Sequence, residues 1–195
     1  MDPINQEKKT QNGRLLVISG PSGSGKSTLT REAVRRTNAK ISISATTRKP
    51  GLNETEGVDY YFLTENEFLE KIAAGEFLEH ARVFGHYYGT PAAPVEERLQ
   101  NGLTILLEID VQGARQVFKR YPEAIGILVV APDSKTLRER LCGRGREKED
   151  IIKKRLEKAE WERQEAESLN NFKHIIINDK IEQAIDELVK IIKPT

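Results

Sequence analysis

The chain has 195 residues, and its 31 Lys and Arg residues nearly balance its 30 Asp and Glu residues, leaving a formal net charge of +1. This balance argues against a basic nucleic-acid or membrane surface, and 37% hydrophobic with 31% charged residues is typical of a soluble globular protein. The single cysteine, Cys142, excludes an internal disulfide, and no apolar run reaches the roughly 20 residues of a membrane helix. We therefore expect one compact cytoplasmic domain with no nucleic-acid or membrane partner.

Residues 1–13 are polar and aperiodic, so we expect a flexible tail, and they lack the apolar core of a signal peptide. Short aliphatic runs then alternate with helical patterns. The runs occupy 14–19, 41–44, 104–109, 127–130 and 174–177, and the helical patterns 27–36, 95–100, 111–121, 134–141 and 181–192. Runs that are apolar at nearly every position suit strands buried on both faces. The alternation predicts an α/β fold, an open parallel sheet flanked by helices with right-handed crossovers.

Two stretches interrupt this alternation. Residues 45–94 contain shorter alternating pieces at 59–63, 77–84 and 86–88, and a capping box at Thr64 and Glu67 opens a helix to about Ala74. These pieces predict a small β-rich insertion. Residues 138–163 are charged and helical with glycines at 143 and 145, which makes them a candidate moving lid. The remaining segments, 14–44, 95–137 and 164–195, form the expected core.

A glycine-rich turn follows the first predicted strand. Residues 20–27 match G-x-x-x-x-G-K-[ST] between a buried strand and a helix, and a chance match in a chain of this length is on the order of one in a hundred. Backbone N–H groups and the helix N-terminus would bind ATP phosphates, with Lys26 reaching the β- and γ-phosphates. The predicted ATP site comprises Gly20, Pro21, Ser22, Gly23, Ser24, Gly25, Lys26, Ser27 and Thr28.

The predicted strand before residue 110 ends on an acidic residue. Asp110 occupies the position of the acid that orients Mg²⁺ through water, and the Ser27 hydroxyl is the predicted direct Mg²⁺ ligand. Residues 110–113 also fit the D-x-x-G of small GTPases. That alternative further requires an N-K-x-D motif for guanine, whereas residues 177–180 read Ile-Asn-Asp-Lys, which disfavours it.

Polar residues in the insertion suggest a second nucleotide site. An arginine fork matches phosphate oxygens, so Arg48 with the hydroxyls of Tyr60 and Tyr88 suits a phosphate. Glu79 can accept from the N1–H and amino group of guanine, which adenine lacks, and Ser44 and Thr90 can donate to its O6. Each residue also has an ordinary alternative: core aromatics for the tyrosines, a solvated edge charge for Glu79, and a turn position for Thr90.

Eight ordered motifs make the chain from Leu15 to Lys193 resemble bacterial-type guanylate kinases. They lie at 20–27, 44–48, 57–60, 75–79, 87–90, 108–113, 140–145 and 177–179. The resemblance implies a P-loop NTPase-type core, a GMP-binding insertion at 45–94 and a lid at 138–163. It also implies the reaction ATP + GMP → ADP + GDP, with Mg²⁺ as cofactor and dGMP as a further acceptor.

The resemblance also implies individual roles. The GMP contacts would be Ser44, Arg48, Tyr60, Glu79, Tyr88, Thr90 and Asp110, with Glu108 as a further guanine contact. The catalytic cations would be Lys26, Arg48, Arg144 and Arg155, while Arg140, Arg144 and Asn178 would contact ATP. Outside this set, we expect Lys158 and Arg163 on a solvated helix face and Cys142 buried as a small hydrophobe.

One position departs from the family pattern. Where the family usually reads T-T-R-x-P-R, residues 46–51 end on Gly51, so the second phosphate-binding arginine is missing and we expect weaker GMP affinity. Two alternatives stay open: a non-catalytic guanylate-kinase-like interaction module, or a monophosphate kinase with another acceptor. Retention of Lys26, Ser27, Arg48 and Arg144 disfavours the first. The sequence does not favour a monomer over a homo-oligomer.

Overall fold

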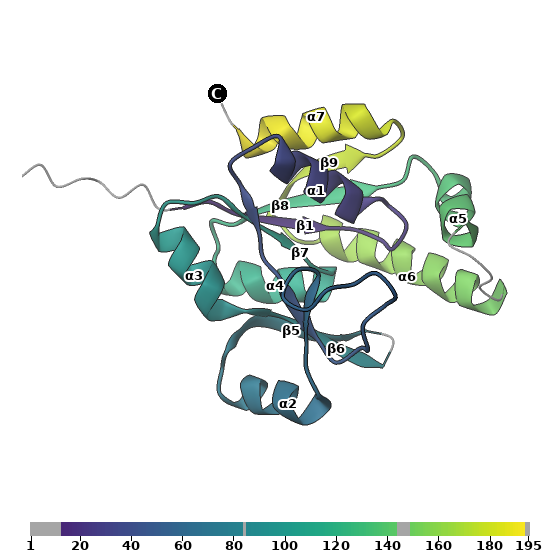
Figure 1. Cartoon of the computed structure of the whole chain (residues 1–195). Helices are drawn as coiled ribbons and strands as arrows, with labels where there is room; N and C mark the ends of the chain where they lie inside the picture. Colours follow the sequence, from purple (N-terminus) through teal and green to yellow (C-terminus); the bar gives the residue numbers. More distant parts are fainter. Residues whose placement is uncertain (1–12, 84, 144–148, 194–195) are drawn as a thin grey trace, which may run out of the picture.

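The computed structural model describes residues 13–83, 85–143 and 149–193. Its main sheet has five strands that pair in parallel in the order β2-β7-β1-β8-β9 (Figure 1). Their bounds are β1 (Leu15–Ser19), β2 (Lys40–Ile41), β7 (Ile105–Glu108), β8 (Ile125–Val130) and β9 (Phe172–Ile177). The predicted parallel α/β sheet is confirmed.

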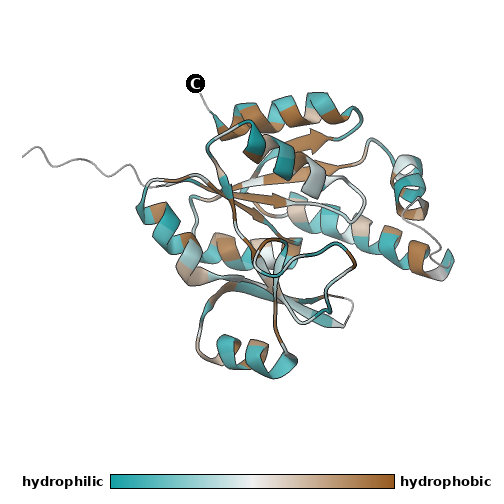
Figure 2. Cartoon of the chain, in the orientation of Figure 1, coloured by the Kyte–Doolittle hydropathy of each residue, from teal (hydrophilic) through white to brown (hydrophobic). Residues whose placement is uncertain are grey.

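Helices cover both faces of this sheet. α1 (Lys26–Arg35) and α7 (Ile181–Ile192) lie on one face, and α3 (Ala92–Gln100), α4 (Val111–Arg120) and α6 (Glu149–Glu167) lie toward the other (Figure 1). In β1, Leu16 and Ile18 pack into the α1/α7 cluster, while Leu15 and Val17 pack into the α3/α4 cluster. Figure 2 shows the result as hydrophobic strands between helices with hydrophilic outer faces. Burial on both faces explains why the strands read as continuous apolar runs.

A second sheet lies beside the first. It contains β3 (Ser44–Thr46), β4 (Tyr60–Phe62), β5 (Phe77–Val83) and β6 (His86–Pro91) in the order β4-β3-β6-β5. The predicted capping box of Thr64 and Glu67 opens α2 (Glu65–Ala73), which places Phe68 against Phe77 with ring centroids 4.5 Å apart. The β-rich character predicted between 45 and 94 is therefore observed, with a small core of its own.

The expected single strand at 41–44 is wrong. The main-sheet ladder ends where the Ser42 N–H donates to the Leu106 carbonyl, and Ser44 already pairs with Tyr60 in the second sheet. The chain thus passes from one sheet to the other within three residues. The break between the two strands arises because the backbone pairs first with β7 and then with β4. No glycine or proline in the sequence marks this position.

The charged stretch 138–163 is divided between two helices. α5 (Ser134–Cys142) ends before the glycines, and α6 continues four residues past the expected end of the lid. The last turn of α6 is part of the core, because Ala166 is fully buried against Val111 and Leu128. Arg144 and Gly145 lie outside the described residues. Cys142, which was expected to be buried, is exposed.

Among the helices that the structure describes, none combines the length and apolar character needed to span a bilayer.

Candidate active site

The glycine-rich loop joins β1 to α1 at the carboxyl edge of the main sheet. Gly20, Gly23 and Gly25 all have positive φ, and Gly25 is the N-cap of α1 with φ 92°. The Lys26 ammonium donates to the carbonyl oxygens of Gly20 and Pro21, the latter at 2.9 Å. Gly25 offers no side chain to cap α1, and a helix N-terminus that follows a glycine-rich loop favours an anion.

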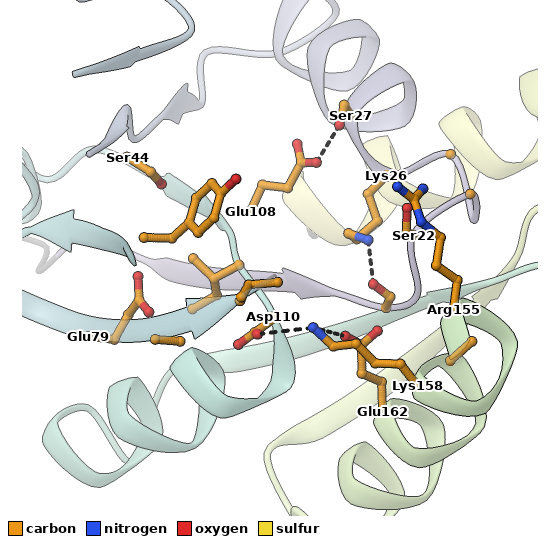
Figure 3. Close-up of a pocket in the computed structure, with 18 of the residues that line it drawn as sticks. Ser22, Lys26, Ser27, Ser44, Glu79, Glu108, Asp110, Arg155, Lys158 and Glu162 are labelled. Carbon is orange, nitrogen blue, oxygen red and sulfur yellow. Dashed lines mark hydrogen bonds and ion pairs between the residues drawn. The ribbon is translucent and has the colours of Figure 1, made fainter. Parts of the chain in front are cut away.

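A cavity of about 300 Å³ opens between this loop, the second sheet, the carboxyl end of β7 and α6 (Figure 3). It brings together most of the predicted site residues from both halves of the site. These are Gly20, Ser22, Gly23, Gly25, Lys26, Ser27, Ser44, Tyr60, Glu79, Tyr88, Glu108, Asp110 and Arg155. The predicted phosphate loop and the predicted guanine contacts therefore face one shared space.

Glu79 is the buried carboxylate of this cavity, with only 4% of its surface exposed. Its Oε1 accepts the Thr90 hydroxyl at 2.6 Å, so this hydroxyl is used within the protein and Thr90 does not line the cavity. A Cβ built on Gly113 would lie 2.2 Å from Glu79 Oε2, so any larger residue at this helix position would displace the Glu79 carboxylate. Burial, together with the nearby charge of Asp110, raises the pKa of Glu79 to about 7 despite the lowering effect of the Thr90 hydrogen bonds.

The two acids at the carboxyl end of β7, Glu108 and Asp110, have separate partners. The Ser27 hydroxyl donates to Glu108 Oε1 at 2.5 Å. Asp110 instead caps α4, where its Oδ1 accepts the N–H groups of Gln112 and Gly113 at 3.0 Å each. The carboxylate that contacts the P-loop hydroxyl is thus Glu108, which was expected as a guanine contact, whereas the water-mediated Mg²⁺ role of Asp110 stays a prediction. A hydroxyl and a carboxylate are oxygen donors of the kind Mg²⁺ prefers, provided that phosphates and water complete its coordination.

Arg48 is not among the residues that line the cavity, but it lies beside Tyr60, which does line it. Its guanidinium donates to Glu54 Oε1 and to the Lys49 carbonyl at 2.7 Å each, and it lies 5.5 Å from the centre of the Tyr60 ring. Glu54 Oε2 also accepts the Gly51 N–H at 2.7 Å. The ion pair raises the pKa of Arg48 and lowers that of Glu54, while burial raises the pKa of Tyr60.

Asn178 and Arg140 brace the P-loop from behind. The buried Asn178 amide donates to the Ser24 carbonyl at 2.7 Å, and Arg140 donates to the Asn178 carbonyl at 2.9 Å. Pro21, Ser24 and Thr28 belong to the loop and helix but do not line the cavity. The role predicted for Arg144 falls outside the described residues.

Two lining residues were missed by the sequence analysis. Lys158 and Glu162 line the cavity with Arg155 and Ala159, whereas Lys158 was expected on a solvated face. The spacing 155, 158, 159, 162 places all four on one side of a helix, and this periodicity was the available signal. Arg163 does lie on the exposed face, paired with Glu160 and Glu167.

A glycine-rich phosphate loop at the β1–α1 turn, opposite a second sheet with a buried carboxylate, defines a P-loop nucleotide-binding protein with two facing subsites. The guanylate kinase family model matches residues 12–195. The chain is 47% identical over 177 residues to a guanylate kinase of Carboxydothermus hydrogenoformans, covering 90% of this chain and 85% of that protein. For a guanylate kinase of Fusobacterium nucleatum, identity is 46% over 181 residues, covering 93% and 96%.

A solved structure agrees with these relatives. The crystal structure of guanylate kinase from Anaplasma phagocytophilum is similar with a TM-score of 0.77 and 32% identity, covering 94% of this chain and 86% of that one. The chain belongs to the guanylate kinase family.

Proposed function

We propose that the protein transfers the terminal phosphoryl group of ATP to GMP, giving ADP and GDP, and that dGMP is a second acceptor. The observation that carries this proposal is the fully buried Glu79, which faces the same cavity as the P-loop lysine, Lys26. A phosphate site and a guanine-selective carboxylate in one space suit direct transfer between two nucleotides.

The donor subsite would be the P-loop. Positive φ at its glycines turns backbone N–H groups toward bound phosphate, and the N-terminus of α1 adds a positive dipole. Lys26 would exchange its two carbonyl contacts for the β- and γ-phosphates. Asn178 and Arg140 act from behind, because they hold the loop at Ser24.

Mg²⁺ is the cofactor we propose, with Ser27 and Glu108 as its protein-side oxygen donors. When bound, the ion supplies positive charge against the β- and γ-phosphates. Asp110 is less suited to this role, since two α4 N–H groups already hold one of its carboxylate oxygens.

The acceptor subsite would recognise guanine through Glu79 and Asp110. Ionised carboxylates accept the N1–H and amino group of guanine, and AMP would leave them unpaired, which permits discrimination of roughly 10⁴-fold. The Ser44 hydroxyl would donate to the O6 of guanine. Tyr60, Tyr88 and Arg48 would bind the acceptor phosphate, and Arg48 would have to give up its contact with Glu54 to do so.

Transfer would require the two subsites to be pressed together. We assign the moving parts to the GMP-binding insertion at 45–94 and the lid at 138–163, which would close over the core segments and exclude water. Arg155 lines the cavity already, and Arg144 is its proposed partner over the triphosphate, whereas Arg140 would support the P-loop from behind through Asn178. These cations would offset the repulsion between two phosphate groups.

A side-by-side acceptor assay tests the proposal. ADP formation from ATP and Mg²⁺ is measured with GMP, dGMP, AMP and UMP at equal concentrations, and Lys26→Ala serves as the inactive control. Fast turnover with GMP and dGMP only is the expected result. Preference for AMP or UMP would favour another monophosphate kinase, and no turnover with any acceptor would favour a non-catalytic interaction module.

A further inference from the structure

The proposed transfer leaves two charged residues of the cavity without a role. Lys158 and Glu162 lie one turn apart on α6 and point into the same space as Lys26, Glu79 and Asp110 (Figure 3). Neither is needed for phosphate or guanine binding as proposed above. Their placement nevertheless differs from that of an ordinary surface pair on a helix.

Glu162 is buried, with 5% of its surface exposed, on a helix whose other acids are mostly solvated. Burial raises its pKa, and the nearby Lys158 and Lys26 lower it. A buried carboxylate is costly unless a cation lies beside it. Lys158 supplies this cation, since its ammonium lies 3.4 Å from Glu162 Oε1.

Lys158 also connects α6 to the acceptor side of the cavity. Its ammonium lies 3.9 Å from Asp110 Oδ2, and 24% of its side chain is exposed. The other Asp110 oxygen is held by the first N–H groups of α4, and the Gln112 amide approaches Oδ2 at 3.3 Å. Lys158 is therefore the cation that faces the Asp110 oxygen left to a substrate.

The C-terminal end of α6 packs against α4. Ala166, one turn beyond Glu162, is fully buried in the cluster with Val111 and Leu128, and Glu165 pairs with Arg115 of α4. Glu162 thus lies beside the packed C-terminal end of α6, and Lys158 lies one turn closer to the N-terminal end of the helix. A shift of the N-terminal part of α6 would be transmitted first to Lys158.

We propose that Lys158, held by Glu162, is a positioning residue that orients the Asp110 carboxylate for the acceptor base and offsets its repulsion from Glu79 and Glu162. The proposal rests on the acceptor subsite described above. Guanine binding would then depend on the position of α6. The Lys158–Asp110 contact would link closure on the donor side to binding of the acceptor.

The test compares Lys158→Met, Lys158→Arg and Glu162→Gln with Lys154→Met, an exposed lysine on the same helix. We expect the KM for GMP to rise about tenfold in Lys158→Met and Glu162→Gln, with the KM for ATP within about twofold. Lys158→Arg should retain most of the GMP affinity. The double variant should be no worse than Lys158→Met, because Glu162 acts through Lys158.

Three outcomes overturn the proposal: a Lys158→Met KM for GMP equal to that of Lys154→Met, a parallel rise in the KM for ATP, or additive losses in the double variant. Calorimetric titration of GMP into each ligand-free variant gives a second reading that does not depend on turnover. Failure of the proposed function is seen separately, because the unmodified protein would then not phosphorylate GMP.

Discussion

Replacing Glu79 by glutamine should make the nucleotide-free protein more stable while weakening its hold on GMP. The carboxyl is buried, and burial raises its pKa from an ordinary 4.5 to about 7. Folding therefore favours the protonated carboxyl. At any pH where the unfolded chain ionises this group, the free energy of unfolding of the folded protein is lowered. Glutamine keeps the shape and the Thr90 hydrogen bond but carries no charge.

The size of the effect follows from the two pKa values. At 1.36 kcal/mol per pH unit, ionising Glu79 in the folded state costs about 3 kcal/mol above pH 7. The penalty disappears as the pH falls below 4.5, and it is about 1 kcal/mol at pH 5.5. Since 1 kcal/mol corresponds to roughly 2–4 °C for a chain of this size, Glu79→Gln should raise Tm by about 6–12 °C at pH 8.5 and by much less at pH 5.5.

The assay is thermal unfolding of both proteins without nucleotide at pH 5.5, 7 and 8.5, followed by the KM values for GMP and ATP. The stability gain should grow with pH, and the KM for GMP should rise strongly with the KM for ATP nearly unchanged. A Tm difference that is the same at every pH would refute the reasoning, because it would show that Glu79 does not titrate differently in the folded protein. Such opposition between stability and activity is common at binding sites.

Three further substitutions test separate parts of the site. Lys26→Ala should lower turnover by at least about a hundredfold in the ADP-formation assay, and a mild effect would contradict its role at the phosphates. Gly51→Arg should lower the KM for GMP severalfold, because it restores the phosphate-binding arginine that this chain lacks. The added Cβ would meet only the flexible Glu54 carboxylate at 3.2 Å, and an unchanged KM would show that the position is silent. Gly113→Ala should raise the KM for GMP about tenfold by displacing Glu79, although alanine favours the helix by about 1 kcal/mol; unaltered GMP kinetics would contradict the predicted clash.

Much of the fold was predictable because its signals are local. The P-loop, the capping box of α2 and the apolar face of α7 are each encoded within a few residues. The strands of the main sheet were readable because burial on both faces leaves continuous aliphatic runs. The passage from β2 to β3 was not predictable, since it depends on pairing with Leu106 on one side and Tyr60 on the other, both distant in the sequence.

The sequence identified most of the residues that line the cavity, but not which of them contact one another. Asp110 was expected to orient Mg²⁺ through water, which stays a prediction, and the sequence did not show that Asp110 also caps α4 or that Glu108 contacts Ser27. Lys158 was expected on a solvated face, because its i,i+4 spacing from Glu162 is the same on a surface and in a cavity. Only the packing of the last turn of α6 on α4 distinguishes the two cases.

The brace between Asn178 and Ser24 joins residues 154 positions apart in the chain. During translation, the phosphate loop is therefore synthesised long before β9, the strand whose end supports it. The nascent polypeptide carries an unbraced loop for most of its synthesis, and nucleotide binding should appear only when β9 has added to the sheet. Truncated products that end before this strand should therefore bind ATP poorly.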